Sequence, residues 1–212
     1  SSFGFIALLT VHATSVEDTK DRLAAKLHLA ARFGDEEATR ILLKAGADPD
    51  ALTKRAPGTA EGNSALIIAT ESGHVGGVKA LLDHGASLDL RSRADNTALY
   101  IAAARGHVHL VKTLIAAGAA VDRRGTGSGD ADSSATPLAA AAENGWAAVV
   151  KLLIRAGASL DARDEPGGRT PLHLAILHGS SCYEDHAERR PGHDQVVSAL
   201  LAAGASRALE MR

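Results

Sequence analysis

A repeated arrangement of apolar residues and glycines is the feature that most constrains the fold of this chain. Five times, an apolar segment that begins with a leucine is followed by a glycine, a second apolar segment and a Gly-Ala pair. The leading leucines are Leu27, Leu66, Leu99, Leu138 and Leu172, so successive copies begin 39, 33, 39 and 34 residues apart. A basic period of 33 residues with small insertions explains all four steps. Self-similarity at such a period indicates a stack of short structural units.

Each copy carries the signals of two short helices. Thr136-Pro137 and Thr170-Pro171 are typical helix starts, because threonine accepts hydrogen bonds from free amides and proline fits the first helical position. A glycine seven residues after the leading leucine ends the first helix. In the second segment, apolar residues recur at spacings of three and four, which places them on one helix face. A short run that ends in aspartate follows the Gly-Ala pair in four copies: Asp50, Asp89, Asp122 and Asp161.

These motifs resemble the ankyrin-repeat family over roughly residues 23–206. The Thr-Pro-Leu-His-Leu-Ala string at 170–175 is an almost complete copy of the family's most specific signature. Repeats two and three depart from it with Ser64-Ala65 and Thr97-Ala98, and repeat one has Ala25-Lys26. The resemblance implies an all-α repeat solenoid, an ankyrin-repeat stack of helix–turn–helix units with β-hairpin fingers, in which neighbouring units share their stability.

We expect three segments. Residues 1–22 form an N-terminal lid or tail, in which Phe3, Phe5 and Leu8 belong to an apolar run that would cover the first repeat; a disordered tail is the alternative. Residues 23–206 form the ankyrin-repeat domain, and residues 207–212 form a C-terminal tail. The expected repeats are about 20–52, 59–91, 92–124, 131–163 and 165–206.

Three insertions interrupt the period. Two lie in fingers, at 52–62 and 123–135, and the third, at 180–192, separates Gly179 from a second Gly-His turn at Gly192-His193. Insertions in repeat proteins usually form loops on one face and give a member its individual function. Neutral variation of surface loops is the alternative.

Composition and motifs argue against several classes of protein. The net charge of −2 gives no general attraction to nucleic acid or membrane, and the apolar run 3–11 is too short to span a bilayer. A single cysteine, Cys182, fits a reducing compartment, so we expect a cytoplasmic or other intracellular location, with the nucleus as an alternative. Phosphate-binding loops, nucleophile elbows and zinc-protease motifs are missing. We therefore expect no enzyme, no cofactor and no metal.

The leading functional hypothesis is a monomeric interaction module or scaffold that binds a protein or peptide through its finger tips and concave groove. Mapping by repeat position selects ten partner-binding candidates: Arg93, Asn96, Tyr100, Arg105, Arg124, Glu143, Asn144, Trp146, Arg169 and His178. Tyr100 and Trp146 stand where the family usually has histidine, and large aromatics and arginines are common in binding hot spots. Local packing is the alternative for each.

Basic residues recur in the fingers, at Lys54, Arg55, Arg91, Arg93, Arg123, Arg124, Arg163 and Arg169. Stacked fingers would align them, and a row of arginines favours an acidic or phosphorylated peptide. The alternative is a solvated face neutralised by neighbouring aspartates such as Asp89, Asp122, Asp161 and Asp164.

A hypothesis of another class places a small-molecule or metal-dependent activity at the repeat-five insertion. The potential ligands there are His178, Cys182, Glu184, Asp185, His186 and His193, although their spacing matches no common zinc signature. A polar loop is the alternative. A third possibility is a passive structural piece of a longer chain. His28 and His173 occupy the Leu-His-Leu position, where the family uses histidine in structural hydrogen bonds.

Overall fold

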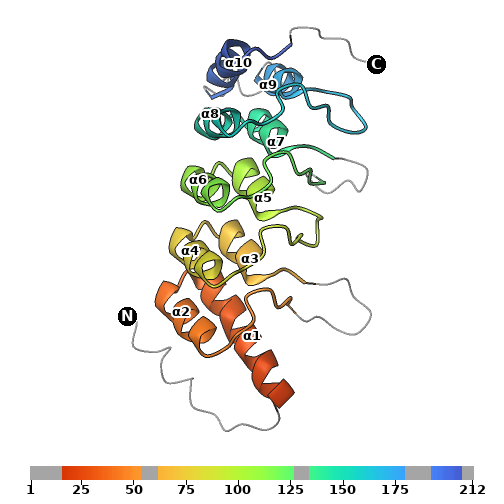
Figure 1. Cartoon of the computed structure of the whole chain (residues 1–212). Helices are drawn as coiled ribbons and strands as arrows, with labels where there is room; N and C mark the ends of the chain where they lie inside the picture. Colours follow the sequence, from red (N-terminus) through yellow and green to blue (C-terminus); the bar gives the residue numbers. More distant parts are fainter. Residues whose placement is uncertain (1–15, 54–61, 127–133, 180–191, 207–212) are drawn as a thin grey trace, which may run out of the picture.

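The structure, a computed structural model, describes residues 16–53, 62–126, 134–179 and 192–206 (Figure 1). The described residues form five pairs of helices. The first helices of the pairs are α1 (Val16–Phe33), α3 (Ala65–Glu71), α5 (Ala98–Ala104), α7 (Pro137–Glu143) and α9 (Pro171–Gly179). The second helices are α2 (Glu36–Lys44), α4 (Val75–Asp83), α6 (Val108–Ala116), α8 (Ala147–Arg155) and α10 (Gly192–Ala202).

The pairs stack in chain order, so that first helices contact first helices and second helices contact second helices (Figure 1). The segments that connect one pair to the next, such as residues 84–97, project on the side of the first helices. Every unit therefore packs mainly on its sequence neighbours, as in other repeat stacks. The expected all-α repeat solenoid is confirmed.

Capping residues explain why the first helices begin where they do. The side-chain oxygens of Ser64, Thr97 and Thr136 accept hydrogen bonds from backbone amides three residues later, at Ile67, Tyr100 and Ala139. This N-cap satisfies an amide that has no partner inside the helix. Repeats two and three thus start their helices correctly without the Thr-Pro dipeptide.

One apolar core runs through all five pairs. The leading leucines of the repeats are at most 2% exposed. Ala69, Ala102 and Ala141, in the first helices, are completely buried, and their small side chains let neighbouring helices approach closely. This explains how a chain with only 3% aromatic residues builds a continuous core.

Single antiparallel bridges close three of the fingers at their bases: Leu52 with Ser64, Arg91 with Thr97, and Gly125 with Ala135. A fourth bridge, between Ser134 and Glu165, joins neighbouring fingers. The bridges therefore pair the two sides of these fingers at their bases, and the fourth bridge holds two neighbouring fingers together.

Two features of the ends refine the expected segments. Helix α1 begins at Val16, so the boundary expected after residue 22 lies inside a helix, while the apolar residues at 3–9 lie outside the described residues. In repeat five, α9 ends at Gly179 and α10 begins at Gly192, and residues 180–191 lie outside the described part. Among the described helices, none combines the length and apolar character needed to span a membrane.

Candidate functional site

A line of side chains joins successive repeats at the turns between first and second helices; we call it the turn edge. His74, Trp146 and His193 each follow the glycine of such a turn or, for His193, of its counterpart after the repeat-five insertion. Their ring nitrogens lie 3.1, 2.9 and 2.9 Å from the carbonyl oxygens of Arg32, Ala104 and Glu143, at the end of the preceding first helix. Each bond therefore fastens one repeat to the one before it.

Glycine makes this contact sterically feasible. A Cβ atom on Gly106 would lie 2.5 Å from the Trp146 ring, and one on Gly145 would lie 2.8 Å from the His193 ring. Both glycines have positive φ, 73° and 74°, which L-residues with side chains rarely adopt. The rings thus rest directly on the glycine backbone of the preceding turn.

Repeat three uses a different donor. The guanidinium Nη1 of Arg105 donates a 2.6 Å hydrogen bond to the carbonyl oxygen of Glu71, at the end of the preceding first helix. His107, the residue that follows the turn glycine here, packs more loosely over Gly73, where an added Cβ would lie 3.4 Å from the ring. Burial lowers the pKa of His107, and the nearby Arg105 charge lowers it further. Arg105 therefore has a structural contact of its own.

The ten candidate residues differ in accessibility. Asn96 and Tyr100 are buried, and Tyr100 belongs to a small apolar cluster with Ala139 and Leu174 of the following repeats. Glu143, Arg124 and Arg169 are half-buried. The exposed candidates are Arg93, Arg105, Asn144, Trp146 and His178.

The structure brings five of the candidates together at the turn edge. Trp146 reaches from Ala104 to Gly106 and so lies beside Arg105, and its side chain remains 43% exposed. Glu143 and Asn144 precede it on the same turn, and His178 Nε2 of the next repeat lies 3.6 Å from Glu143 Oε1. Arg105, Glu143, Asn144, Trp146 and His178 thus form one continuous strip across repeats three to five.

Apart from Tyr100 in α5, the other candidates lie in the fingers, where most arginines are paired. Arg91 contacts Asp95 at 2.5 Å, Arg123 lies 3.5 Å from Asp89, and Arg124 lies 3.6 Å from Glu165. Arg169 makes a 2.9 Å contact with Asp164, whose side chain is almost fully buried. Lys54 and Arg55 lie outside the described residues. The described fingers therefore fit the self-paired alternative better than a free basic row.

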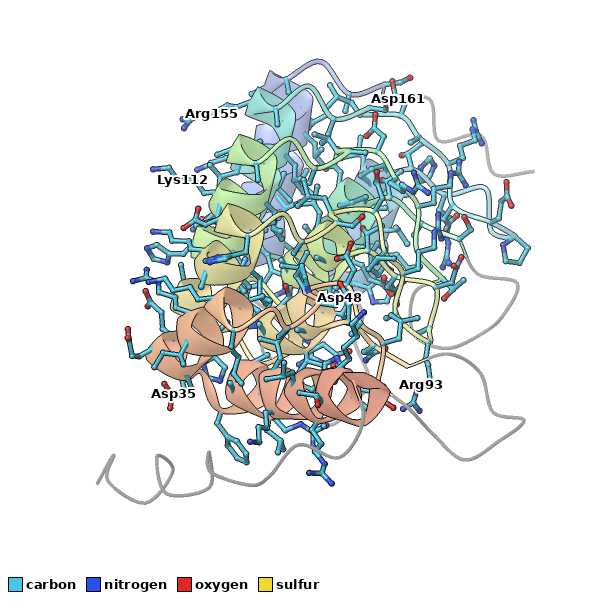
Figure 2. All side chains as sticks on the ribbon, turned by 60° about the horizontal axis from the view of Figure 1, so that its bottom comes forward. Asp35, Asp48, Arg93, Lys112, Arg155 and Asp161 are labelled. Atoms are coloured by element: carbon cyan, nitrogen blue, oxygen red, sulfur yellow. The ribbon has the colours of Figure 1, made fainter. Side chains whose placement is uncertain are left out.

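Arg93 differs from these arginines. Its backbone amide donates to the Asn63 side chain, whereas its guanidinium makes no ion pair within the described residues. Figure 2 shows Arg93 at the outer side of the fingers.

The recurring aspartates have a role that sequence reasoning missed. Asp50, Asp122 and Asp161 accept hydrogen bonds from the backbone amides of Ser87, Ser159 and Ser206, at 2.8, 3.0 and 2.9 Å. Each bond links the end of one repeat to the Gly-Ala turn of the next. A signal was available, because Ser87 and Ser159 follow Asp50 and Asp122 at the same spacing of 37 residues.

The structural histidines behave as the resemblance implied. His28 Nε2 lies 2.8 Å from the Ala51 carbonyl oxygen, and His173 Nδ1 lies 2.7 Å from the Thr170 hydroxyl. Burial lowers the pKa of His28, and its hydrogen bond to Ala51 offsets part of that effect.

The repeat-five ligand set is only partly described. Cys182, Glu184, Asp185 and His186 lie outside the described residues, while the buried His193 ring is engaged at the turn edge. Within the described ranges, no group of three His, Cys, Asp or Glu side chains is arranged to hold a metal ion. A shallow hollow of about 420 Å³ lies between α8 and α10, lined by Lys151, Asp194, Gln195, Ser198 and Ala199, and none of the ten candidates lines it.

Comparison with known proteins agrees with this geometry. A family model described as ankyrin repeats (3 copies) matches residues 27–125 and again residues 124–206. A search of curated proteins returned no match. The two family matches together cover most of the chain, from within α1 to beyond α10, and the chain therefore belongs to the ankyrin-repeat family.

Proposed function

We propose that this chain is a protein-interaction module, as ankyrin repeats generally are, and that the turn edge of repeats three to five is a main contact with its partner. The observation that carries the proposal is the state of Trp146. Its indole is fixed by a hydrogen bond to Ala104 and by packing on Gly106, yet 43% of the side chain is exposed. An exposed aromatic that is already ordered loses little entropy on binding and is a typical hot-spot residue.

The neighbours of Trp146 supply polar contacts of both charge signs. Arg105, Asn144 and His178 are exposed, and the Glu143 carboxylate lies at the centre of the strip. Such a surface suits a partner with an apolar anchor and a mixed polar rim. At the fingers, Arg93 is the candidate with the best access to a partner, and a contact with an acidic group there belongs to the same proposal.

A monomer in the cytoplasm remains our proposal for the assembly and the compartment. The single cysteine and the balanced charge support it. The family is typically non-enzymatic, which agrees with a role in binding. Light scattering of the purified protein measures the mass in solution directly.

The test compares baits in an extract of the native cells. The informative variant is Trp146→His, because a histidine at this position makes the contact between repeats in repeats two and five. A Lys44→Gln bait is the control, since Lys44 is exposed at the end of α2 in repeat one, outside the strip in repeats three to five. We expect a partner that the native and control baits capture and that Trp146→His captures at least roughly tenfold less, the loss typical of a hot-spot residue. Equal capture by all three baits would contradict a contact at the turn edge.

A further inference from the structure

The second helices carry a row of basic side chains at one repeated position. Lys79, Lys112 and Lys151 each lie six residues before the glycine that ends the second helix of their repeat. Those glycines, Gly85, Gly118 and Gly157, have φ values of 83°, 93° and 85°, so the three helices end in the same way. The lysines therefore occupy equivalent places on α4, α6 and α8, which contact one another in that order.

The orientation of the row follows from the helix. Two residues after each lysine comes a leucine that is completely buried: Leu81, Leu114 and Leu153. Residues two apart in a helix point in nearly opposite directions, since each residue turns the helix by about 100°. All three lysines are accordingly exposed, and Figure 2 shows Lys112 and Arg155 on the side of the molecule opposite Arg93.

The row keeps an excess of positive charge, although Asp83 lies four residues after Lys79 and Asp194 lines the same hollow as Lys151. None of the three lysines forms an ion pair with a described residue. The helices α4, α6 and α8 together carry four basic residues, Arg155 being the fourth, against one acidic residue, Asp83. The finger arginines other than Arg93 are mostly paired, whereas the three lysines line up on the second helices and include none of the ten candidates for partner binding.

The row is also narrow, and it does not continue onto the neighbouring second helices α2 and α10. At the equivalent position of α2, Arg40 pairs with Glu36 at 2.6 Å, and α10 has Ser198 there. Beside the row, the exposed positions Ala116 on α6 and Ala148 on α8 are neutral, and Arg155 adds one basic residue on α8, four residues after Lys151. A membrane surface or a nucleic-acid duplex requires a broad positive field. A single line of point charges fits a linear acidic chain instead.

We propose that the lysine row, Lys79, Lys112 and Lys151, binds an acidic peptide segment in an extended, polyproline II conformation. Neighbouring packed helices lie about 8–10 Å apart, so successive lysines have about that spacing. A polyproline II chain rises about 3.1 Å per residue with three residues per turn, so every third side chain points the same way, roughly 9 Å further along. An acidic residue at every third position thus meets one lysine per repeat. The partner would be held from the face opposite the fingers, independently of the turn edge.

The probe is a fluorescein-labelled peptide of Pro-Pro-Glu triplets, and binding is measured by fluorescence anisotropy at low and at physiological salt. We expect the triple variant Lys79→Glu, Lys112→Glu, Lys151→Glu to lose at least roughly tenfold in affinity, because three charge contacts become repulsive. The same three positions changed to arginine keep the charge and should keep the affinity. Trp146→His should bind the probe as the native protein does.

A matched control distinguishes an effect of the lysine row on binding from an effect of the protein's net charge. Lys20, Arg22 and Arg32 are exposed and lie outside the second helices, so changing all three to glutamate alters the net charge equally. Equal losses in the two triple-glutamate variants would overturn the proposal, because the binding would then depend on total charge only. Unchanged melting curves of both variants show that folding is not the cause of any loss.

Two further measurements test the spacing of the acidic residues in the ligand and the class of molecule to which the ligand belongs. A peptide of the same composition with its glutamates contiguous should bind at least roughly threefold more weakly, since only one or two of them would reach a lysine. If this peptide bound as tightly as the triplet peptide, the proposed match between the spacing of the glutamates and the spacing of the lysines would be wrong. Tighter, row-dependent binding to a short DNA duplex or to vesicles with phosphatidylserine would overturn the assignment to a peptide.

Discussion

The Arg105 guanidinium and the Glu71 carbonyl oxygen form a 2.6 Å hydrogen bond across the boundary between repeats two and three. Repeats two, four and five make the equivalent bond with a ring from the residue after the turn glycine. The bond is thus a property of the stack that different side chains can supply. It also identifies Arg105 as a residue with a structural role, whatever it contributes to binding.

Replacing Arg105 by alanine should destabilise the protein by about 1 kcal/mol, because one hydrogen bond between repeats is lost from an exposed site. Urea unfolding followed by circular dichroism measures this. Arg93→Ala is the control, since its guanidinium makes no ion pair within the described residues, and it should stay within about 0.5 kcal/mol of the native protein. The same Arg105→Ala variant should raise the pKa of His107, since the Arg105 charge lowers it, and a histidine NMR titration reports that shift. An unchanged His107 pKa would contradict the described proximity.

Stability should fall as the pH is lowered through the histidine range. Burial lowers the pKa values of His28 and His107 in the folded state below the ordinary value of 6.5. The unfolded chain therefore binds more protons than the folded chain between 6.5 and those lowered values, so acid favours unfolding. The contribution of these groups is complete above pH 6.5 and is lost as the pH falls through their folded pKa values.

Urea unfolding at a series of pH values from about 8 to 5 tests this linkage. His28→Gln should be less stable than the native protein at the upper end, because the contact with Ala51 is weakened. Its stability should depend less steeply on pH, because one lowered pKa is removed. A slope equal to that of the native protein would mean that His28 does not carry the effect.

The fold could be predicted from the sequence because several positions of the repeat accept only a few residue types. Glycine at the positive φ of the turns, and threonine or serine at the helix starts, are local requirements that recur from copy to copy. Tyr100 could also have been placed correctly: the equivalent residues are apolar in repeats two and four, Ile67 and Ala139, and histidines of structural type in repeats one and five, which predicts a position facing the neighbouring repeat.

The candidate site was less predictable because pairing depends on where side chains from different loops meet. Arg124 is paired with Glu165 of the next finger, and Arg91 with Asp95 across its own turn. Neither ion pair could be predicted from the repeat pattern, because the pattern identifies equivalent arginines but not the acidic residues that pair with them. Alignment of the second helices would have revealed the lysine row, since Lys79 and Lys112 are separated by the 33-residue period.

The aspartate bonds between repeats predict a contrast between two equivalent residues. Asp122 accepts from the Ser159 amide and from its hydroxyl, at 3.0 and 2.6 Å, whereas Asp89 has a 3.5 Å contact with Arg123. Asp122→Ala should therefore cost about 1–2 kcal/mol, while Asp89→Ala, which removes an exposed ion pair, should cost less than about 0.5 kcal/mol. Thermal or urea unfolding measures both. Similar losses in the two variants would show that the bond to Ser159 contributes little.

Two glycines separate the cost of backbone conformation from the cost of packing. Gly106 and Gly118 have φ values of 73° and 93°, so alanine is strained at either position by about 1–2 kcal/mol. A Cβ on Gly118 meets nothing within 4 Å, whereas one on Gly106 would lie 2.5 Å from the Trp146 ring. Gly106→Ala should therefore destabilise the protein by roughly 1–3 kcal/mol more than Gly118→Ala, because the indole must shift and lose its bond to Ala104.

A double-mutant cycle with Trp146→Ala tests the cause of that difference. Without the indole, Gly106→Ala should cost about as much as Gly118→Ala, since only the backbone strain remains. The coupling between Gly106 and Trp146 should accordingly be about as large as the extra loss in the single variant. If Gly106→Ala remained equally costly without the indole, the packing of Trp146 on the preceding turn would not be the reason. Packing on Gly106 would then not hold the Trp146 indole in a fixed position, although the proposed partner contact depends on a fixed indole.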